Sequence, residues 1–196
     1  MARRLTHLLS IAFIVAATGG CASPMARFYT LGSTATVGDT PAARYAVMVG
    51  PVSIPASVDR PQFVVQVAPN RVEVDEFNRW AAPLNDSIAR AVAGDLAVLL
   101  GTPDVSTTML ANFTPAYRVT IAVQRFESIQ GEAALIDAVW VVLKSADGKS
   151  RSGRTIAREA VQGQGFDPLA AAHSRALATM SADIAAAIRT EADRKK

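Results

Sequence analysis

The spacing of apolar residues changes in an ordered way along this 196-residue chain, and that order limits the folds available to it. Three segments rich in alternating or β-branched residues come first, at 45–54, 62–68 and 71–75. An apolar stripe with a step of three or four follows, at Leu84, Ile88, Val92, Leu96 and Leu99. Alternation predicts strands, whereas a step of three or four predicts a helix with one buried face.

The same change of period is repeated in the second half of the chain. Residues 117–127, 132–145 and 154–162 predict three strands, and Asp147-Gly148 is a strong hairpin signal between the last two. A second helical stripe follows, at Leu169, His173, Leu177, Met180, Ile184 and Ile188. The order β-β-β-α-β-β-β-α predicts an α+β fold: a single, mostly antiparallel sheet of about six strands, with both helices packed on one face.

The stretch "DEFNRWAAPLND", residues 75–86, lies where the third predicted strand gives way to the first helix. Pro83 suits a first helical turn, because its missing N–H has no helical partner there. Gly101 and Pro103 are stop signals for the same helix, and Asp167-Pro168 is a start signal for the second helix. The polar, aromatic stretch is therefore interpreted as a corner of the fold.

The first twenty residues carry the pattern of an export signal. Arg3 and Arg4 precede an apolar run at 8–17, and small residues follow at Thr18-Gly19-Gly20. The run is too short to span a bilayer, which needs roughly 20 apolar residues. Cys21 comes next and is the only cysteine, so it has no partner for an internal disulfide.

Gly19-Gly20-Cys21 resembles the end of a bacterial lipobox, in which the cysteine becomes lipidated, although Thr18 stands where leucine is usual. Ala22, in place of an aspartate, implies by the same resemblance the outer membrane. We therefore expect a lipoprotein signal peptide (1–20), a lipidated cysteine and flexible tether containing "RFYTLG" (21–44), a domain (45–190) and a polar tail (191–196).

The charge and the reactive residues exclude several classes of function. Removal of Arg3 and Arg4 lowers the basic residues from 20 to 18, against 17 acidic ones, so the mature chain lacks the charge of a nucleic-acid-binding protein. His173 is the one histidine left after the signal; we expect it to pack between helix and sheet, and one histidine makes a zinc site improbable.

Carboxylates are the remaining catalytic candidates. Glu73 and Asp75 share one face of a predicted strand, and Asp86 begins the helix nearby; a solvated strand face beside a helix terminus explains them more simply. Asp137 interrupts the apolar strand "ALIDAVWVVL", where it either faces a partner or forms a hydrogen bond within the sheet.

Four segments together resemble the ABC-type transport auxiliary lipoproteins, the PqiC family: "RFYTLG", "VGPVSIPASVDRPQFVV", "FNRWAAPLNDSIARAVAGDL" and "YRVTIAVQRFES". The resemblance implies an outer-membrane lipoprotein facing the periplasm that works with MCE-domain proteins, whose tunnels carry phospholipids between the two bacterial membranes, and with an inner-membrane transporter component. It offers no catalytic residue to transfer, so Cys21, as the lipid attachment site, is the one residue carried over. Trp80 is expected to bury its ring at the corner between sheet and helix.

Three hypotheses for function follow. The first is a non-enzymatic lipoprotein, without a cofactor, that docks the tunnel protein at the outer membrane. It would form a homo-oligomeric ring, because such tunnels are oligomeric. The second is a periplasmic lipid or lipopolysaccharide chaperone, which needs an apolar pocket of roughly 300 Å³ or more lined by the sheet. The third is a hydrolase that uses Glu73, Asp75 and Asp86, which requires the three carboxylates to converge in a cleft.

Overall fold

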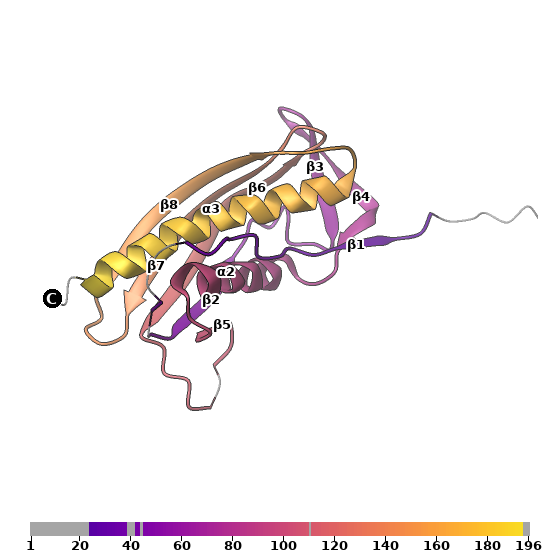
Figure 1. Cartoon of the computed structure of the whole chain (residues 1–196). Helices are drawn as coiled ribbons and strands as arrows, with labels where there is room; N and C mark the ends of the chain where they lie inside the picture. The colour runs from indigo at the N-terminus through magenta and orange to yellow at the C-terminus, as the bar shows by residue number, and fades with distance from the viewer. Residues whose placement is uncertain (1–23, 39–41, 44, 110, 194–196) are drawn as a thin grey trace, which may run out of the picture.

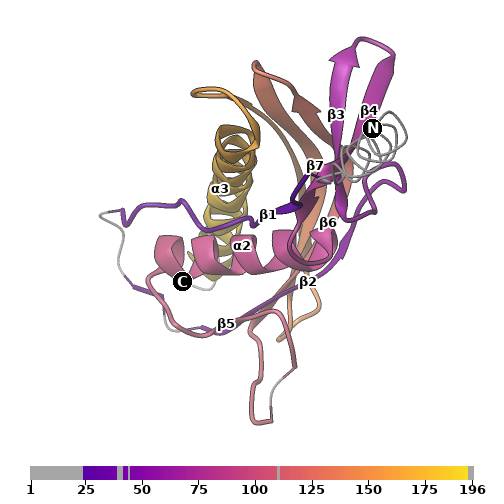
Figure 2. The same cartoon turned by 90° about the vertical axis from the view of Figure 1, so that its right-hand side faces the viewer.

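The computed structural model describes residues 24–38, 42–43, 45–109 and 111–193, and it shows two helices on one face of a curled sheet (Figures 1 and 2). The predicted signal peptide and Cys21 lie outside the described residues. The elements in chain order are β1 (Arg27–Tyr29), β2 (Val47–Ser53), β3 (Gln62–Ala68), β4 (Arg71–Trp80), α2 (Leu84–Leu100), β5 (Val105–Ser106), β6 (Tyr117–Ile129), β7 (Ala133–Lys144), β8 (Ser150–Ala160) and α3 (Phe166–Asp193).

Strand β6 is the centre of the sheet. One of its edges pairs antiparallel with β7, which pairs antiparallel with β8, and this confirms the predicted meander. Its other edge pairs in parallel with two strands in succession, with β2 from Val47↔Tyr117 onward and with β3 at Val65↔Ser128. Strand β4 pairs antiparallel with β3, while the short strands β1 and β5 extend the sheet beside β4 and β2.

The prediction of a mostly antiparallel sheet is wrong. Within the described part of the chain, four of the seven strand pairings are parallel and the sheet is mixed. The physical reason lies in the connection through α2, which returns the chain so that β6 runs in the same direction as β2 and β3. Such a crossover makes parallel neighbours, and alternation within a strand does not report the direction of its neighbour.

Both predicted helices are present with their expected buried stripes. Helix α2 follows Pro83 and ends at Gly101, whose φ of 65° is the left-handed conformation that glycine adopts without steric cost. Leu96 is fully buried in α2, as are Leu177 and Ile184 in α3. Helix α3 continues to Asp193, beyond the predicted start of the polar tail, because Glu191 is buried on its inner face.

The corner between β4 and α2 is closed by aromatic packing. Trp80 is 5% exposed, and its ring stacks on Phe63 of β3 with the ring centroids 4.0 Å apart. Tyr29 of β1 meets the same Phe63 ring edge to face at 5.4 Å. The predicted burial of Trp80 is therefore confirmed. Phe63 contacts both Trp80 and Tyr29, and this packing joins the N-terminal strand to the core.

Candidate functional site

The three carboxylates of the hydrolase hypothesis do not converge. Glu73 is exposed near the start of β4, on a hairpin that projects from the rest of the sheet (Figure 2). Asp86 lines a surface depression with Arg90 and residues 49–52, and neither Glu73 nor Asp75 lines that depression. The structure therefore does not gather the three acids in one cleft, as the hydrolase hypothesis requires.

Asp75 has a structural role at a bend in β4. Its Oδ1 accepts hydrogen bonds from the backbone amides of Phe77 (2.9 Å) and Asn78 (2.8 Å) and from the side-chain amide of Asn78 (3.0 Å). Burial raises the pKa of Asp75, but these hydrogen bonds to the charged form outweigh it, so the pKa lies below its ordinary value. The carboxylate holds the local backbone in place.

His173 packs between α3 and the sheet, as its place in the helical stripe predicts. The side chain is fully buried, and its ring stacks on Phe126 with centroids 4.0 Å apart and planes 6° from parallel. Its Nε2 lies 2.8 Å from the hydroxyl of Ser128. Burial lowers the pKa of His173 to about 3, which keeps the ring neutral near pH 7. A ring enclosed in this way has no access to a substrate.

The described residues also offer no metal centre, since nowhere among them do three or more His, Cys, Asp or Glu side chains gather in a way that would hold an ion. Among the helices that the structure describes, none is both long and apolar enough to cross a membrane.

The face of the sheet opposite the helices exposes apolar side chains on β7 and β8. Ile156 is 61% exposed, and Val139 and Leu143 are each 36% exposed. We call the outward-pointing side chains of β6, β7 and β8 the outer face. Because alternate residues of these strands point inward to the helices, the outer apolar residues contribute nothing to the core.

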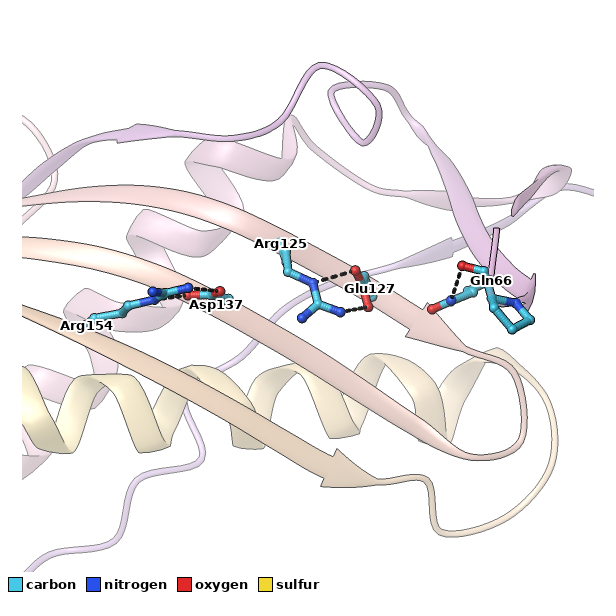
Figure 3. Close-up of polar contacts among 6 residues, drawn as sticks. Gln66, Arg125, Glu127, Asp137 and Arg154 are labelled. Atoms are coloured by element: carbon cyan, nitrogen blue, oxygen red, sulfur yellow. Dashed lines mark hydrogen bonds and ion pairs between the residues drawn. The ribbon is translucent and has the colours of Figure 1, made fainter. Parts of the chain in front are cut away.

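Ion pairs lie among these apolar residues (Figure 3). Arg154 forms a two-bonded pair with Asp137 at 2.8 and 2.6 Å, and Arg125 forms one with Glu127 at 2.7 and 2.8 Å. The hydrogen bonds from Arg154 lower the pKa of Asp137 against the opposing effect of burial. Asp137 therefore forms a hydrogen bond within the sheet, which is one of the two roles that its sequence position left open.

A depression of about 250 Å³ opens where β3 separates from β6. We call it the outer groove; it is lined by Pro55, Ser57, Val58, Val64, Gln66, residues 69–72 and residues 124–128. Within it, the side-chain amide of Gln66 donates to the carbonyl of Pro69 at 3.3 Å (Figure 3). Its lining combines hydrocarbon with polar groups of both charges, a mixture that suits a polypeptide partner better than a lipid tail.

The opposite side of the sheet, which faces α2 and α3, is closely packed along the described part of the chain. Side chains of α2 and α3 fill it and form one continuous buried cluster with the strands, including the fully buried Leu96, Ile121, Ile136 and Met180. The lipid-chaperone hypothesis requires an apolar pocket against the sheet. The buried cluster occupies that position between the helices and the strands.

The segment after β1 is bound to both helices. We call residues 31–35 the strap. Asp95, fully buried in α2, accepts through Oδ1 a hydrogen bond from the Ser33 hydroxyl at 2.7 Å and from the amides of Thr34 and Ala35, each at 3.0 Å. Its other oxygen accepts from Ser181 of α3 at 3.1 Å. The sequence predicts a tether in part of residues 22–44, and within that range β1 and the strap pack against the domain.

Sequence reasoning did not single out Asp95 or the outer groove. Asp95 did carry a signal, because it is an acid inside the apolar run "AVAGDLAVLL". Gly94 carried another: a Cβ on Gly94 would lie 3.0 Å from the Cβ of Ser33, so the glycine allows the strap to approach the helix closely. The groove had no local signal, since it joins segments more than fifty residues apart.

A packed core and a curled, mixed sheet with two helices on one face define the class of protein as an α+β domain. The family model for the ABC-type transport auxiliary lipoprotein component matches residues 29–185, and the chain belongs to this family. The protein is thus an auxiliary lipoprotein component of ABC-type transport systems, and the family implies membrane anchoring and a non-enzymatic role.

Two solved structures share the fold. One is a crystal structure of an uncharacterized protein, with a TM-score of 0.70 and 19% identity over 84% of this chain and 99% of that chain. The other is protein XCC0632 from Xanthomonas campestris, of the DUF330 family, with a TM-score of 0.70 and 21% identity over 87% of this chain and 100% of that chain. No curated protein matches the chain.

Proposed function

We propose that this protein is a docking lipoprotein of the PqiC type, anchored through Cys21 in the outer membrane and facing the periplasm. In this role it holds the outer-membrane end of an MCE-domain tunnel protein, which an inner-membrane transporter component serves, and phospholipid passes through the tunnel. The observation that carries the proposal is the outer face, an open sheet surface on a member of a transport auxiliary family.

The chemistry of the outer face supports docking. Its exposed apolar residues provide area that a partner can remove from water, and the Arg154–Asp137 and Arg125–Glu127 pairs provide polar groups on the same surface. Arginine and exposed apolar side chains in a mixed surface are typical of protein interfaces. The outer groove lies at one end of this surface and gives it a concave feature into which a partner side chain fits.

A ring of copies is the arrangement that we propose, because MCE tunnels are oligomeric and a ring would match their symmetry. Each copy would then direct one outer face toward the tunnel. Native mass measurement of the lipidated protein in detergent tests this arrangement. A single copy, in the presence and absence of the tunnel protein, would contradict it.

The anchor is tested by fractionation of cells that express Cys21→Ser. A lipidated cysteine with several acyl chains is held almost irreversibly, since each buried methylene contributes about 0.8 kcal/mol. We expect wild type in the outer-membrane fraction and the processed variant in the soluble periplasmic fraction, with loss of membrane integrity under detergent stress. The length of the variant must be checked, because an uncleaved signal could hold it at the membrane. A processed, soluble wild type would contradict the proposal.

A further inference from the structure

The N-terminal end of the described chain exposes a small apolar patch. Met25 is 87% exposed, Phe28 is 64% exposed and Phe77 is 42% exposed. We call these three residues the terminal patch. Exposed aromatic residues that gather at one place, outside a core that the protein otherwise completes, mark a surface that contacts something else.

The pairing of β1 with β4 brings the patch together. Phe28 lies opposite Arg79 in this parallel pair, and Tyr29 lies opposite Trp80. Tyr29 and Trp80 are buried, so Phe28 and Arg79 point away from the core, and Phe77 points the same way two residues before Arg79. Met25 and Phe77 line one shallow depression together with Arg27. The patch therefore combines apolar side chains with two neighbouring arginines.

The covalent chain places this patch near Cys21. Met25 follows Cys21 by four residues, and a fully extended chain advances about 3.5 Å per residue. The backbone at Met25 thus lies within about 14 Å of the lipidated residue. Beyond Met25 there is little slack, because β1 joins the sheet at Arg27 and the strap is bound by Asp95. An anchor at Cys21 therefore brings this end of the domain to the bilayer surface.

We infer that the terminal patch is a membrane-contact site, in which Phe28, Phe77 and Met25 enter the boundary between lipid headgroups and acyl chains. Arg27 and Arg79 lie beside it. Arg79 pairs with Glu76 at 3.5 Å, so we assign the attraction of anionic headgroups to Arg27. The inference rests on the proposed lipid anchor and adds a second, non-covalent contact. That contact fixes the tilt of the domain at the membrane, which a single-point anchor leaves undetermined.

The test uses the full lipidated chain in vesicles of phosphatidylethanolamine and phosphatidylglycerol. Cys21 is the only native cysteine and is consumed by lipidation, so an introduced cysteine takes a nitroxide spin label at one place. Phe28→Cys and Phe77→Cys probe the patch. Ile156→Cys is the matched control, because Ile156 is 61% exposed, close to the 64% of Phe28, but lies on β8. Relaxation by oxygen, which partitions into lipid, is compared with relaxation by a water-soluble nickel chelate.

On vesicle binding we expect labels at 28 and 77 to lose most of their access to the nickel chelate and to keep access to oxygen, while the label at 156 keeps both. Labels at 28 and 77 that remain open to the chelate on vesicle-bound protein would overturn the inference and leave the anchor intact. Labels closed to both reagents would also overturn it, because they would lie against a second copy of the chain. Protein that fails to bind vesicles would overturn both the anchor and the inference.

Discussion

Lowering the pH from 8 to 5 should destabilise this domain through one residue, His173. Its pKa of about 3 in the folded chain lies far below the value of about 6.5 of a histidine in the unfolded chain. Burial causes this difference, because the protonated ring would carry a charge that water cannot reach. The unfolded chain therefore binds a proton first as the pH falls. The contribution of His173 to the free energy of unfolding is therefore fully present above about pH 6.5 and decreases as the pH falls below that value.

The magnitude follows from the two pKa values. Each pH unit between them costs about 1.4 kcal/mol, so at pH 5, about 1.5 units below the unfolded pKa, the loss is about 2 kcal/mol. This figure hardly depends on the folded pKa, provided that it lies well below 5. Carboxylates contribute in a different window: the pKa values of Asp75 and Asp137 lie below 3.8, so their stabilisation is lost only under stronger acid.

Urea unfolding of residues 22–196 without a histidine tag, at several pH values from 8 to 5, measures this loss. His7 is absent from that chain, so His173 is its only histidine. His173→Gln should be less stable at pH 8 but nearly independent of pH. Ser128→Ala is the control, because it removes the hydroxyl 2.8 Å from Nε2 and keeps the ring buried, so the pH dependence should remain. A flat wild-type curve, or an unchanged slope in His173→Gln, would refute the reasoning.

Four further substitutions, one of them a control, test the packing. Leu96→Ala should cost about 2–5 kcal/mol of unfolding free energy by urea titration, because the side chain is fully buried; a cost below 1 kcal/mol would contradict the buried stripe. Gly153→Ala should destabilise the domain by about 1–3 kcal/mol, since a Cβ there would lie 2.2 Å from the Trp140 ring. Gly32→Ala is the control and should change thermal stability little, because no atom lies within 4 Å of its added Cβ. Equal effects of the two substitutions on thermal stability would contradict this account. Asp95→Ala should release the strap, so that the backbone amides of the strap exchange with solvent faster. Each amide that stays buried without a partner should cost about 1–3 kcal/mol of unfolding free energy. Unchanged amide exchange would contradict the role of Asp95 in holding the strap.

The sequence predicted the elements well because each depends on local periodicity. The predicted strand at 62–68 has the observed bounds of β3, and the predicted stop at Gly101 is the observed end of α2. The buried ring of Trp80 was also predictable from its place at the corner. Alternation identifies the face of a strand, and a step of three or four identifies the face of a helix.

The arrangement of the strands was not predictable in the same way. Both β2 and β3 pair with one edge of β6, and this depends on contacts between residues far apart in the chain. Strands β1 and β5 contain three and two residues, too few for a pattern to emerge. The strap was expected to be a tether because small polar residues are typical of linkers; here they donate hydrogen bonds to Asp95, a partner about sixty residues away.

The central claim of the proposed function is that the partner is an MCE-domain protein. Photo-crosslinking in cells that carry the native transport system tests it most directly, with the crosslinker at Ile156 on the outer face and, as control, at Ala186 on the exposed side of α3. We expect Ile156 to crosslink to an MCE-domain protein and Ala186 to give no such product. Crosslinking to the tunnel protein from Ala186 but not from Ile156, or from neither position, would contradict docking through the outer face.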